Sequence, residues 1–263
     1  MGKVIAIANQ KGGVGKTTTS VNLAASMAAT RRKVLLVDLD PQGNATMASG
    51  VNKYEAERTI YELLVEEQPV RDVIITDTTG GYDLIAANGD ATAAEIRLME
   101  VFARELRLRT ALAPIREEYD YIFIDCPPAL NLLTVNAMSA ADSVLVPMQC
   151  EYFALEGLTA LVDTISKLAA VVNPQLKIEG VLRTMFDHRN RLSNEVSEQL
   201  KQYFGEKVYR TIIPRNVRLA EAPSHGTPVM YYDKSSLGSK AYLGLAGELL
   251  RREEQQQKAE ASA

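Results

Sequence analysis

The sequence has few cysteines and no long apolar segment. Cys126 and Cys150 are its two cysteines, too few for a disulfide framework and too isolated for the usual Cys/His metal sites. No stretch reaches the roughly 18 apolar residues of a membrane span. The first residues, MGKVIAIANQ, contain no apolar segment with a cleavage site of the kind that marks a secretory signal. We therefore expect a cytoplasmic protein with two free thiols and no membrane partner.

Aromatic residues and net positive charge are also scarce. Aromatic side chains make up 6% of the chain, whereas hydrophobic residues make up 46%, so buried strands must rely on Val, Ile and Leu. The formal net charge is −4, and no overall basic character indicates a nucleic-acid partner. Any such partner would need a local basic patch.

Short apolar runs alternate with helical patterns along the chain. Such nearly continuous runs are typical of strands that are covered on both faces of a parallel sheet. The predicted strands are Val4–Ala8, Val34–Val37, Tyr121–Ile124, Val144–Pro147 and Ile178–Leu182. The predicted helices between and after them are Thr17–Ala29, Ala91–Leu112, Leu155–Val172, Asn194–Phe204 and Ser239–Glu254. This alternation predicts a doubly wound α/β fold with a mostly parallel sheet and helices on both faces.

No linker or repeat divides the chain, so we expect a single P-loop domain over residues 1–250. Residues 49–89 form the least regular part of it. The segment that follows, residues 251–263, reads RREEQQQKAEASA and is polar throughout. We expect this tail to be disordered.

A glycine-rich loop directly follows the first predicted strand. It comprises Lys11, Gly12, Gly13, Val14, Gly15, Lys16, Thr17 and Thr18. Glycines let backbone N–H groups approach phosphate oxygens, and the N-terminus of the following helix favours negative charge at the same place. Lys16 can then reach the β- and γ-phosphates of ATP, and the Thr17 hydroxyl can ligate Mg²⁺.

Acidic residues end two of the predicted strands. Asp125 follows an apolar run and is expected at the carboxyl edge of the sheet, where it can hold Mg²⁺ through a water or, alternatively, cap a helix. Asp38 and Asp40 end the second strand, and a cation is needed if both are to lie near one phosphate. Asp38 is either close to the magnesium waters or a structural acid that accepts backbone hydrogen bonds.

The loop resembles the deviant Walker A motif, KGGVGKTT, of ParA/Soj-type chromosome and plasmid partitioning ATPases. The general P-loop pattern has its first glycine where this chain has Gln10, and the chain carries a second lysine, Lys11, instead. Three further segments are similar to motifs of the same family, and the resemblance covers nearly the whole chain, from about Val4 to Leu250. These segments read VDLDPQGN from Val37, YIFIDCPP from Tyr121, and IPRNVR from Ile213 followed by EAPS from Glu221.

The resemblance implies roles for individual residues. Lys11 would act on the nucleotide of a partner subunit in an ATP-bound sandwich homodimer, although from the residue alone it could equally be a solvated lysine. Asp40 would orient the attacking water beside the metal, so that Thr17, Asp40 and Asp125 form the magnesium site. Lys11, Lys16 and Asp40 would be the catalytic residues, and Pro214 and Asn216 would lie at the adenine base.

The segment from residue 183 to residue 218 is locally basic. It contains eight Lys or Arg and four Asp or Glu, which leaves a local charge of +4. Such a segment can bind phosphate backbones without reading bases, or it can be an ordinary solvated surface. The resemblance implies nonspecific binding of double-stranded DNA by the ATP dimer, for which Arg189, Arg215 and Arg218 are the candidates. It also implies a nucleoid-associated protein whose weak hydrolysis is stimulated by a ParB/Spo0J-type centromere-binding partner.

Three other functions are compatible with such a loop. A membrane-surface ATPase like MinD would need a C-terminal amphipathic helix with basic and apolar faces, and the tail has no apolar residues beyond Ala. An electron-transfer ATPase like the nitrogenase iron protein would need cluster-ligating cysteines, and neither cysteine matches that placement. A small metabolic P-loop kinase would turn over a soluble acceptor without DNA.

Overall fold

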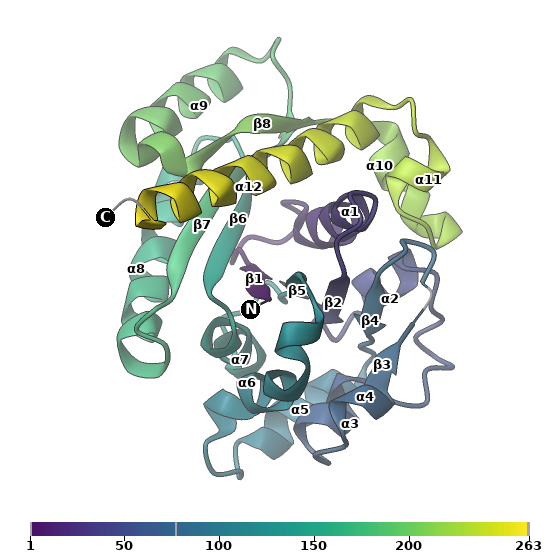
Figure 1. Cartoon of the computed structure of the whole chain (residues 1–263). Helices are drawn as coiled ribbons and strands as arrows, with labels where there is room; N and C mark the ends of the chain where they lie inside the picture. The colour runs from purple at the N-terminus through teal and green to yellow at the C-terminus, as the bar shows by residue number, and fades with distance from the viewer. Residues whose placement is uncertain (1, 77, 262–263) are drawn as a thin grey trace.

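The computed structural model describes residues 2–76 and 78–261, and these form one twisted sheet between two layers of helices (Figure 1). The sheet order is β3-β4-β2-β5-β1-β6-β7-β8, and every pair is parallel except β3 with β4. The strands are β1 Lys3–Ile7, β2 Val34–Asp38, β3 Ile74–Ile75, β4 Asp83–Ile85, β5 Tyr121–Asp125, β6 Ser143–Gln149, β7 Lys177–Phe186 and β8 Val208–Pro214. The predicted fold class is confirmed.

Each face of the sheet is buried by its own set of helices, because successive strand residues point to opposite faces. Val4, Ala6 and Ile122 belong to one apolar cluster, whereas Ile5, Ile7 and Phe123 belong to the other. The first cluster is covered by α3 Ile60–Leu64, α4 Val70–Val73, α5 Asp90–Leu98, α6 Arg107–Leu112, α7 Leu132–Ala140, α8 Ala154–Val172 and α9 Arg191–Phe204. The second is covered by α1 Lys16–Ala28, α2 Asn44–Ala48, α10 Val217–Glu221, α11 Val229–Tyr232 and α12 Leu237–Ala261.

The sheet order places the carboxyl ends of β1, β5 and β2 side by side. Ile7 is in register with Asp125, and Asp125 is in register with Asp38. Strands β2 to β5 lie on one side of β1, and β6 to β8 lie on the other. The carboxyl edge at β1 is therefore the topological switch point, the place where ligands bind in open α/β sheets. The glycine-rich loop begins here.

The prediction of one helix over Ala91–Leu112 is wrong. The structure divides this segment into α5, a turn in which Ala103 has φ 53°, the 3₁₀-turn Arg104–Leu106, and α6. Ile96, Met99 and Phe102, whose spacing suggested the longer helix, are exposed, Phe102 at 95%. Helix α5 instead buries Ala91, Ala94 and Leu98. The less regular region, residues 49–89, supplies α3, α4, the edge strand β3 and its neighbour β4.

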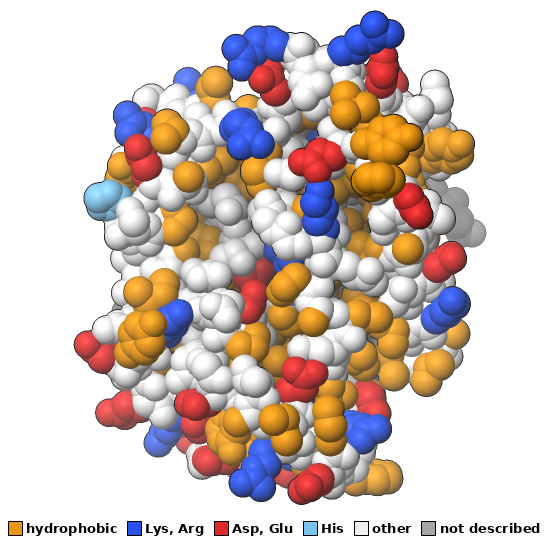
Figure 2. Space-filling model, turned by 180° about the vertical axis from the view of Figure 1, so that it is seen from behind, with side chains coloured by type: hydrophobic (Ala, Val, Ile, Leu, Met, Phe, Trp, Pro, Cys, Tyr) orange, Lys and Arg blue, Asp and Glu red, His pale blue; other side chains and the backbone are white. Residues whose placement is uncertain are grey.

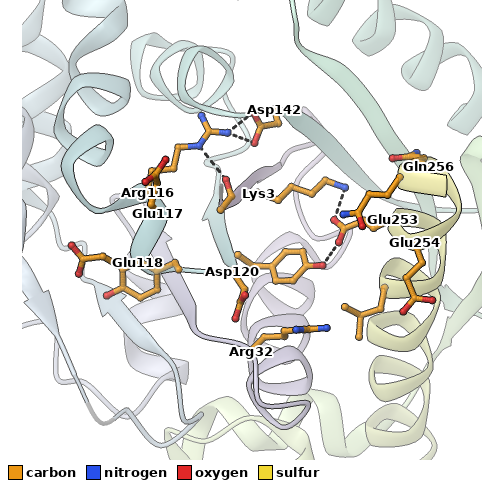
Figure 3. Close-up of a pocket in the computed structure, with 15 residues that line it drawn as sticks. Lys3, Arg32, Arg116, Glu117, Glu118, Asp120, Asp142, Glu253, Glu254 and Gln256 are labelled. Atoms are coloured by element: carbon orange, nitrogen blue, oxygen red, sulfur yellow. Dashed lines mark hydrogen bonds and ion pairs between the residues drawn. The ribbon is translucent and has the colours of Figure 1, made fainter. Parts of the chain in front are cut away.

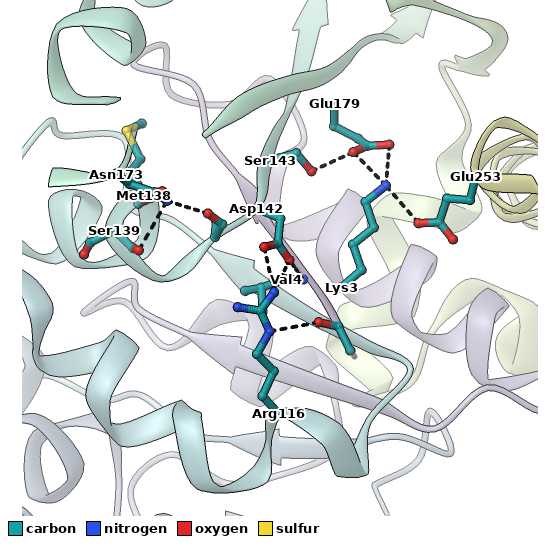
Figure 4. Close-up of polar contacts among 12 residues, drawn as sticks. Lys3, Val4, Arg116, Met138, Ser139, Asp142, Ser143, Asn173, Glu179 and Glu253 are labelled. Atoms are coloured by element: carbon teal, nitrogen blue, oxygen red, sulfur yellow. Dashed lines mark hydrogen bonds and ion pairs between the residues drawn. The ribbon is translucent and has the colours of Figure 1, made fainter. Parts of the chain in front are cut away.

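The prediction of a disordered tail after Leu250 also needs correction. Helix α12 continues to Ala261, while Ser262 and Ala263 lie outside the described residues. The tail sequence contains good helix formers and neither Gly nor Pro before its end. Its first residues are also anchored, since Arg252 donates to the Val208 carbonyl at 3.0 Å and Glu253 pairs with Lys3 at 2.8 Å (Figures 3 and 4).

These anchors border a cavity of about 630 Å³ at the amino edge of the sheet, where Arg116 and Glu253 face its interior (Figure 3). Two ion pairs form among its charged side chains, Arg116 with Asp142 and Lys3 with Glu253. Arg116 donates to both Asp142 oxygens at 2.6 Å, and Lys3 lies between Glu179 and Glu253 (Figure 4). The pairs join β1 to β7 and α12, and the 3₁₀-turn Ala113–Glu118 to the residue before β6, so this edge holds the sheet and the last helix together, away from the glycine-rich loop.

Candidate active site at the carboxyl edge of the sheet

The glycine-rich loop turns from β1 into α1 through two left-handed glycines. Gly13 has φ 73° and Gly15, the N-cap of α1, has φ 87°. These angles are strained for residues with a Cβ, which explains glycine at both positions. The loop therefore presents backbone N–H groups together with the N-terminus of a 13-residue helix, an arrangement that favours phosphate.

Lys16 lies inside this loop. The residue is only 6% exposed, and its Nζ lies 3.4 Å from the Lys11 carbonyl oxygen. Burial lowers the pKa of the Lys16 ammonium, and the negative charges of Asp125 and Asp40 oppose that shift. A lysine held in this way is placed to neutralise phosphate oxygens bound by the loop.

Asp125 and Thr17 come together at the start of α1. The Thr17 hydroxyl donates to Asp125 Oδ2 at 2.7 Å, and the Ser20 hydroxyl donates to Oδ1 at 2.8 Å. Asp125 does not cap the next helix, since Asn131 is the N-cap of α7 and accepts from the Thr134 N–H. The alternative role of Asp125 as a helix cap is therefore excluded.

The donor set at this edge fits Mg²⁺. A hydroxyl and a carboxylate are hard oxygen ligands, and Mg²⁺ in phosphate sites uses one or two such groups together with phosphates and waters. In residues 2–76 and 78–261, no group of three or more His, Cys, Asp or Glu could hold a metal by itself. Thr17 and Asp125 would therefore share the ion with nucleotide oxygens, rather than enclose it in a protein cage.

Asp38 and Asp40 differ in their surroundings. Asp38 is fully buried and accepts hydrogen bonds from the Asp40 N–H at 3.1 Å, the Thr46 N–H at 2.9 Å and the Thr46 hydroxyl at 2.8 Å. These contacts are those of a structural acid that holds the loop after β2. Asp40 accepts from the Gln42 N–H at 3.0 Å, and no other hydrogen bond or ion pair of its carboxylate is found in the described part of the chain.

The negative charges of Asp38, Asp40 and Asp125 lie at one edge of the sheet and repel one another. Burial raises the pKa of both the Asp38 and the Asp125 carboxyl groups, and the negative charge of each neighbouring acid raises it further. A divalent cation would oppose this effect and favour the ionised forms of Asp38 and Asp125. The arrangement thus favours a bound metal in addition to Lys16.

Sequence reasoning missed several residues that contact the glycine-rich loop or the loop after β2. The Thr184 hydroxyl at the end of β7 donates to the Val14 carbonyl at 2.7 Å, and Lys53 donates to the Gln42 carbonyl at 2.5 Å. Lys11 forms an ion pair with Glu151, directly after β6. A polar residue at the carboxyl end of an apolar strand was the available signal for Thr184, whereas no motif marked Lys53 or Glu151.

The residues predicted at the adenine base lie at the end of β8. Pro214 is the last residue of that strand, and Asn216 is the N-cap of α10, where its side-chain oxygen accepts from the Arg218 N–H at 3.0 Å. The position is at the carboxyl edge, three strands away from β1 in the sheet. The geometry gives Asn216 a local role in starting α10, and its contact with a base stays a prediction.

The basic segment divides into paired and unpaired side chains. Arg189 is paired with Asp187 at 2.8 Å, and Arg218 with Glu221 at 2.8 Å and Asp233 at 3.3 Å. No such partner is found for the Arg215 side chain among the residues that the structure describes. Figure 2 shows Lys and Arg side chains scattered over one face of the molecule, several of them next to an acidic side chain.

Arg183 must be removed from the count of surface charges. It is 2% exposed and donates to the Ser197 hydroxyl and to the Tyr209 carbonyl, both at 2.7 Å. Its role is to join β7, α9 and β8, so the accessible charge of this segment is smaller than the sequence suggests.

Two further expectations concern the cysteines and the membrane. Cys126 and Cys150 are both free thiols and both buried. None of the helices in the described part of the chain combines the length and apolarity that crossing a membrane requires.

Comparisons with known proteins agree with this geometry. An AAA domain family model matches residues 2–178. The chain is 53% identical to sporulation initiation inhibitor protein Soj of Bacillus subtilis over 249 residues, which cover 95% of this chain and 98% of Soj. It is 51% identical to chromosome partitioning protein ParA of Caulobacter vibrioides over 257 residues, which cover 97% and 96% of the two chains.

A solved structure extends the similarity to the bound ligands. Cobyrinic acid a,c-diamide synthase from Mycobacterium smegmatis, with bound ADP and magnesium, superimposes with a TM-score of 0.84 at 35% identity, covering 97% of this chain and 96% of that one. The ligands in that structure support ATP and Mg²⁺ as the cofactors of this chain. From its family model, its relatives and its glycine-rich loop, the chain belongs to the AAA domain family and is a P-loop partitioning ATPase of the ParA/Soj type.

Proposed function

We propose that ATP joins two copies of this chain into a sandwich dimer that binds double-stranded DNA without sequence preference. A ParB/Spo0J-type partner then stimulates hydrolysis, which releases the dimer from the DNA and thereby moves chromosomal or plasmid cargo. The protein works in the cytoplasm on the nucleoid. The relatives named as chromosome partitioning proteins support this function over that of a MinD-like membrane-surface ATPase.

One observation carries the dimer proposal. The loop has two lysines, of which Lys16 is buried in the loop, whereas the Lys11 side chain is 56% exposed on its outer side. One lysine already serves the phosphates from within the chain. A second, outward-facing lysine beside the loop is suited to phosphates that a partner subunit brings to it, where a cation can stabilise the charge of the transferring phosphoryl group.

The remaining roles follow from the positions of the side chains. The loop N–H groups and Lys16 bind the phosphates, and Thr17 with Asp125 would hold Mg²⁺. Bound there, the metal would neutralise charge that develops on the phosphate oxygens. Asp40, whose carboxylate lies at the same edge with one backbone hydrogen bond, orients the attacking water.

We expect Arg189, Arg215 and Arg218 to contact DNA phosphates in the ATP dimer. Arg215→Glu is the sharpest test, because this side chain has no hydrogen bond or ion pair to lose among the described residues. Each phosphate contact is worth about tenfold in affinity near 0.1 M salt, and the symmetric dimer loses two contacts. Arg215→Glu should therefore weaken binding to every duplex by about a hundredfold, with ATP binding unchanged.

Retention of labelled DNA by the protein with a non-hydrolysable ATP analogue, measured over a salt series, checks this result. Arg210→Glu is the matched control, since it makes the same charge change at an exposed position of β8, the strand that Arg215 directly follows. Equal DNA retention by the wild type and by the glutamate variants of all three arginines would show that this segment is only a solvated surface.

A further inference from the structure

Lys11 is held within its own subunit by an acidic residue far away in the sequence. Its ammonium pairs with the carboxylate of Glu151, 140 residues later in the chain, and both side chains are about half exposed. Glu151 lies two residues beyond the end of β6, in a short turn fixed by its N–H bond to the Gln149 carbonyl at 3.0 Å. Within the described residues, the Glu151 carboxylate has no other hydrogen bond or ion pair.

The backbone of Lys11 is tied to the same strand. The Lys11 N–H donates to the Asn9 side-chain oxygen at 3.0 Å, and the Asn9 amide donates to the Pro147 carbonyl of β6 at 2.8 Å. Both ends of Lys11 are therefore positioned by β6 and the turn after it. The ammonium must leave the Glu151 carboxylate before it can bind the phosphates of another subunit.

We propose that Glu151 is a positioning residue that retains Lys11 in the monomer and releases it only when a partner's ATP replaces the carboxylate. This inference rests on the proposed function, in which Lys11 acts across the dimer. The exchange replaces one anion by another, and ATP carries more negative charge than ADP, so the triphosphate competes better for the lysine. Glu151 thereby sets the threshold for dimerisation.

The size of the effect follows from the exposure of the pair. A half-exposed ion pair contributes little by itself, since solvent and salt screen it. Two such pairs must open in a symmetric dimer, because both copies present the same surface. Removing the carboxylate should therefore strengthen ATP-dependent dimerisation by about two- to twentyfold, and the gain should shrink as the salt concentration rises.

The test compares Glu151→Gln with Glu156→Gln by sedimentation of the full chain with a non-hydrolysable ATP analogue. Glu156 is exposed in the first turn of α8 and has no hydrogen bond or ion pair in the described part of the chain, so its variant removes the same charge without touching Lys11. Tighter dimerisation of Glu151→Gln alone, with unchanged ATP affinity of the monomer, is the expected result. Unchanged or weaker dimerisation of Glu151→Gln, or an equal gain in both variants, would overturn the positioning role.

Lys11→Gln separates this inference from the proposed function on which it rests. Wild-type dimerisation of Lys11→Gln would remove the cross-subunit role of the lysine, and the proposed function would fail together with the inference. Loss of dimerisation in Lys11→Gln, combined with wild-type behaviour of Glu151→Gln, would leave the proposed function intact and overturn the role of Glu151 alone.

Discussion

Replacing Asp40 by asparagine is expected to slow ATP hydrolysis by about a hundredfold or more while leaving ATP binding intact. The asparagine side-chain oxygen can still accept from the Gln42 N–H, so the loop after β2 keeps its conformation. What it lacks is the negative charge that orients and polarises the attacking water. Asp40→Ala, which loses the hydrogen bond as well, should be as slow but somewhat less stable.

Single-turnover hydrolysis with the enzyme in excess, together with ATP affinity measured by titration, checks this expectation. Asp38→Asn is a useful contrast, because Asp38 accepts three hydrogen bonds around the loop and its replacement should lower the melting temperature. If Asp40→Asn hydrolysed ATP at the wild-type rate, the assignment of the water-orienting acid would be wrong. Loss of ATP binding in that variant would indicate a structural role instead.

Replacing Lys16 by alanine is expected to abolish nucleotide binding at ordinary concentrations. Hydrogen bonds to charged groups contribute about 1.5–3 kcal/mol each, and this ammonium is positioned for both the β- and γ-phosphates, so affinity should fall by at least about a hundredfold. The protein should stay folded, because burial without a direct ion pair already disfavours the charge of this lysine.

Lys16→Met separates charge from packing, since it keeps an apolar stem of similar length in the buried site. Both variants should show a wild-type circular dichroism spectrum and no measurable binding of a fluorescent ATP analogue. Dimerisation and DNA retention should disappear with nucleotide binding. Normal ATP affinity in a folded Lys16→Ala protein would be incompatible with the phosphate-binding loop assigned here.

Much of the fold could be predicted because its signals are local. Buried parallel strands are continuous apolar runs, and those that become β1, β2, β5, β6 and β7 were recognisable in this way. The short strands β3 and β4 were not, since they comprise two and three residues and resemble loops. The division between α5 and α6 was missed because the apolar residues Ile96, Met99 and Phe102 match a helical period but face solvent. Helix α12 extends beyond its predicted end at Glu254 because the polar residues that follow are good helix formers and include neither Gly nor Pro.

The site shows the same division between local and distant information. The glycine-rich loop and Asp125 lie in recognisable motifs, and the parallel register of β1 and β5 brings them together. Thr184 and Glu151 act on the loop from 170 and 140 residues away, so only the fold reveals them. Charge counting also failed for Arg183, because the sequence does not show that this arginine is buried among backbone carbonyls.

The central claim is that ATP joins two copies of this chain, and the molar mass of Asp40→Ala in Mg²⁺-ATP and in Mg²⁺-ADP tests it most directly. Slow hydrolysis should keep this variant in its ATP state throughout a light-scattering measurement. The account predicts the monomer mass of 28.9 kDa with ADP and twice that mass with ATP. The same mass with both nucleotides, at concentrations where ATP binding is saturated, would contradict it.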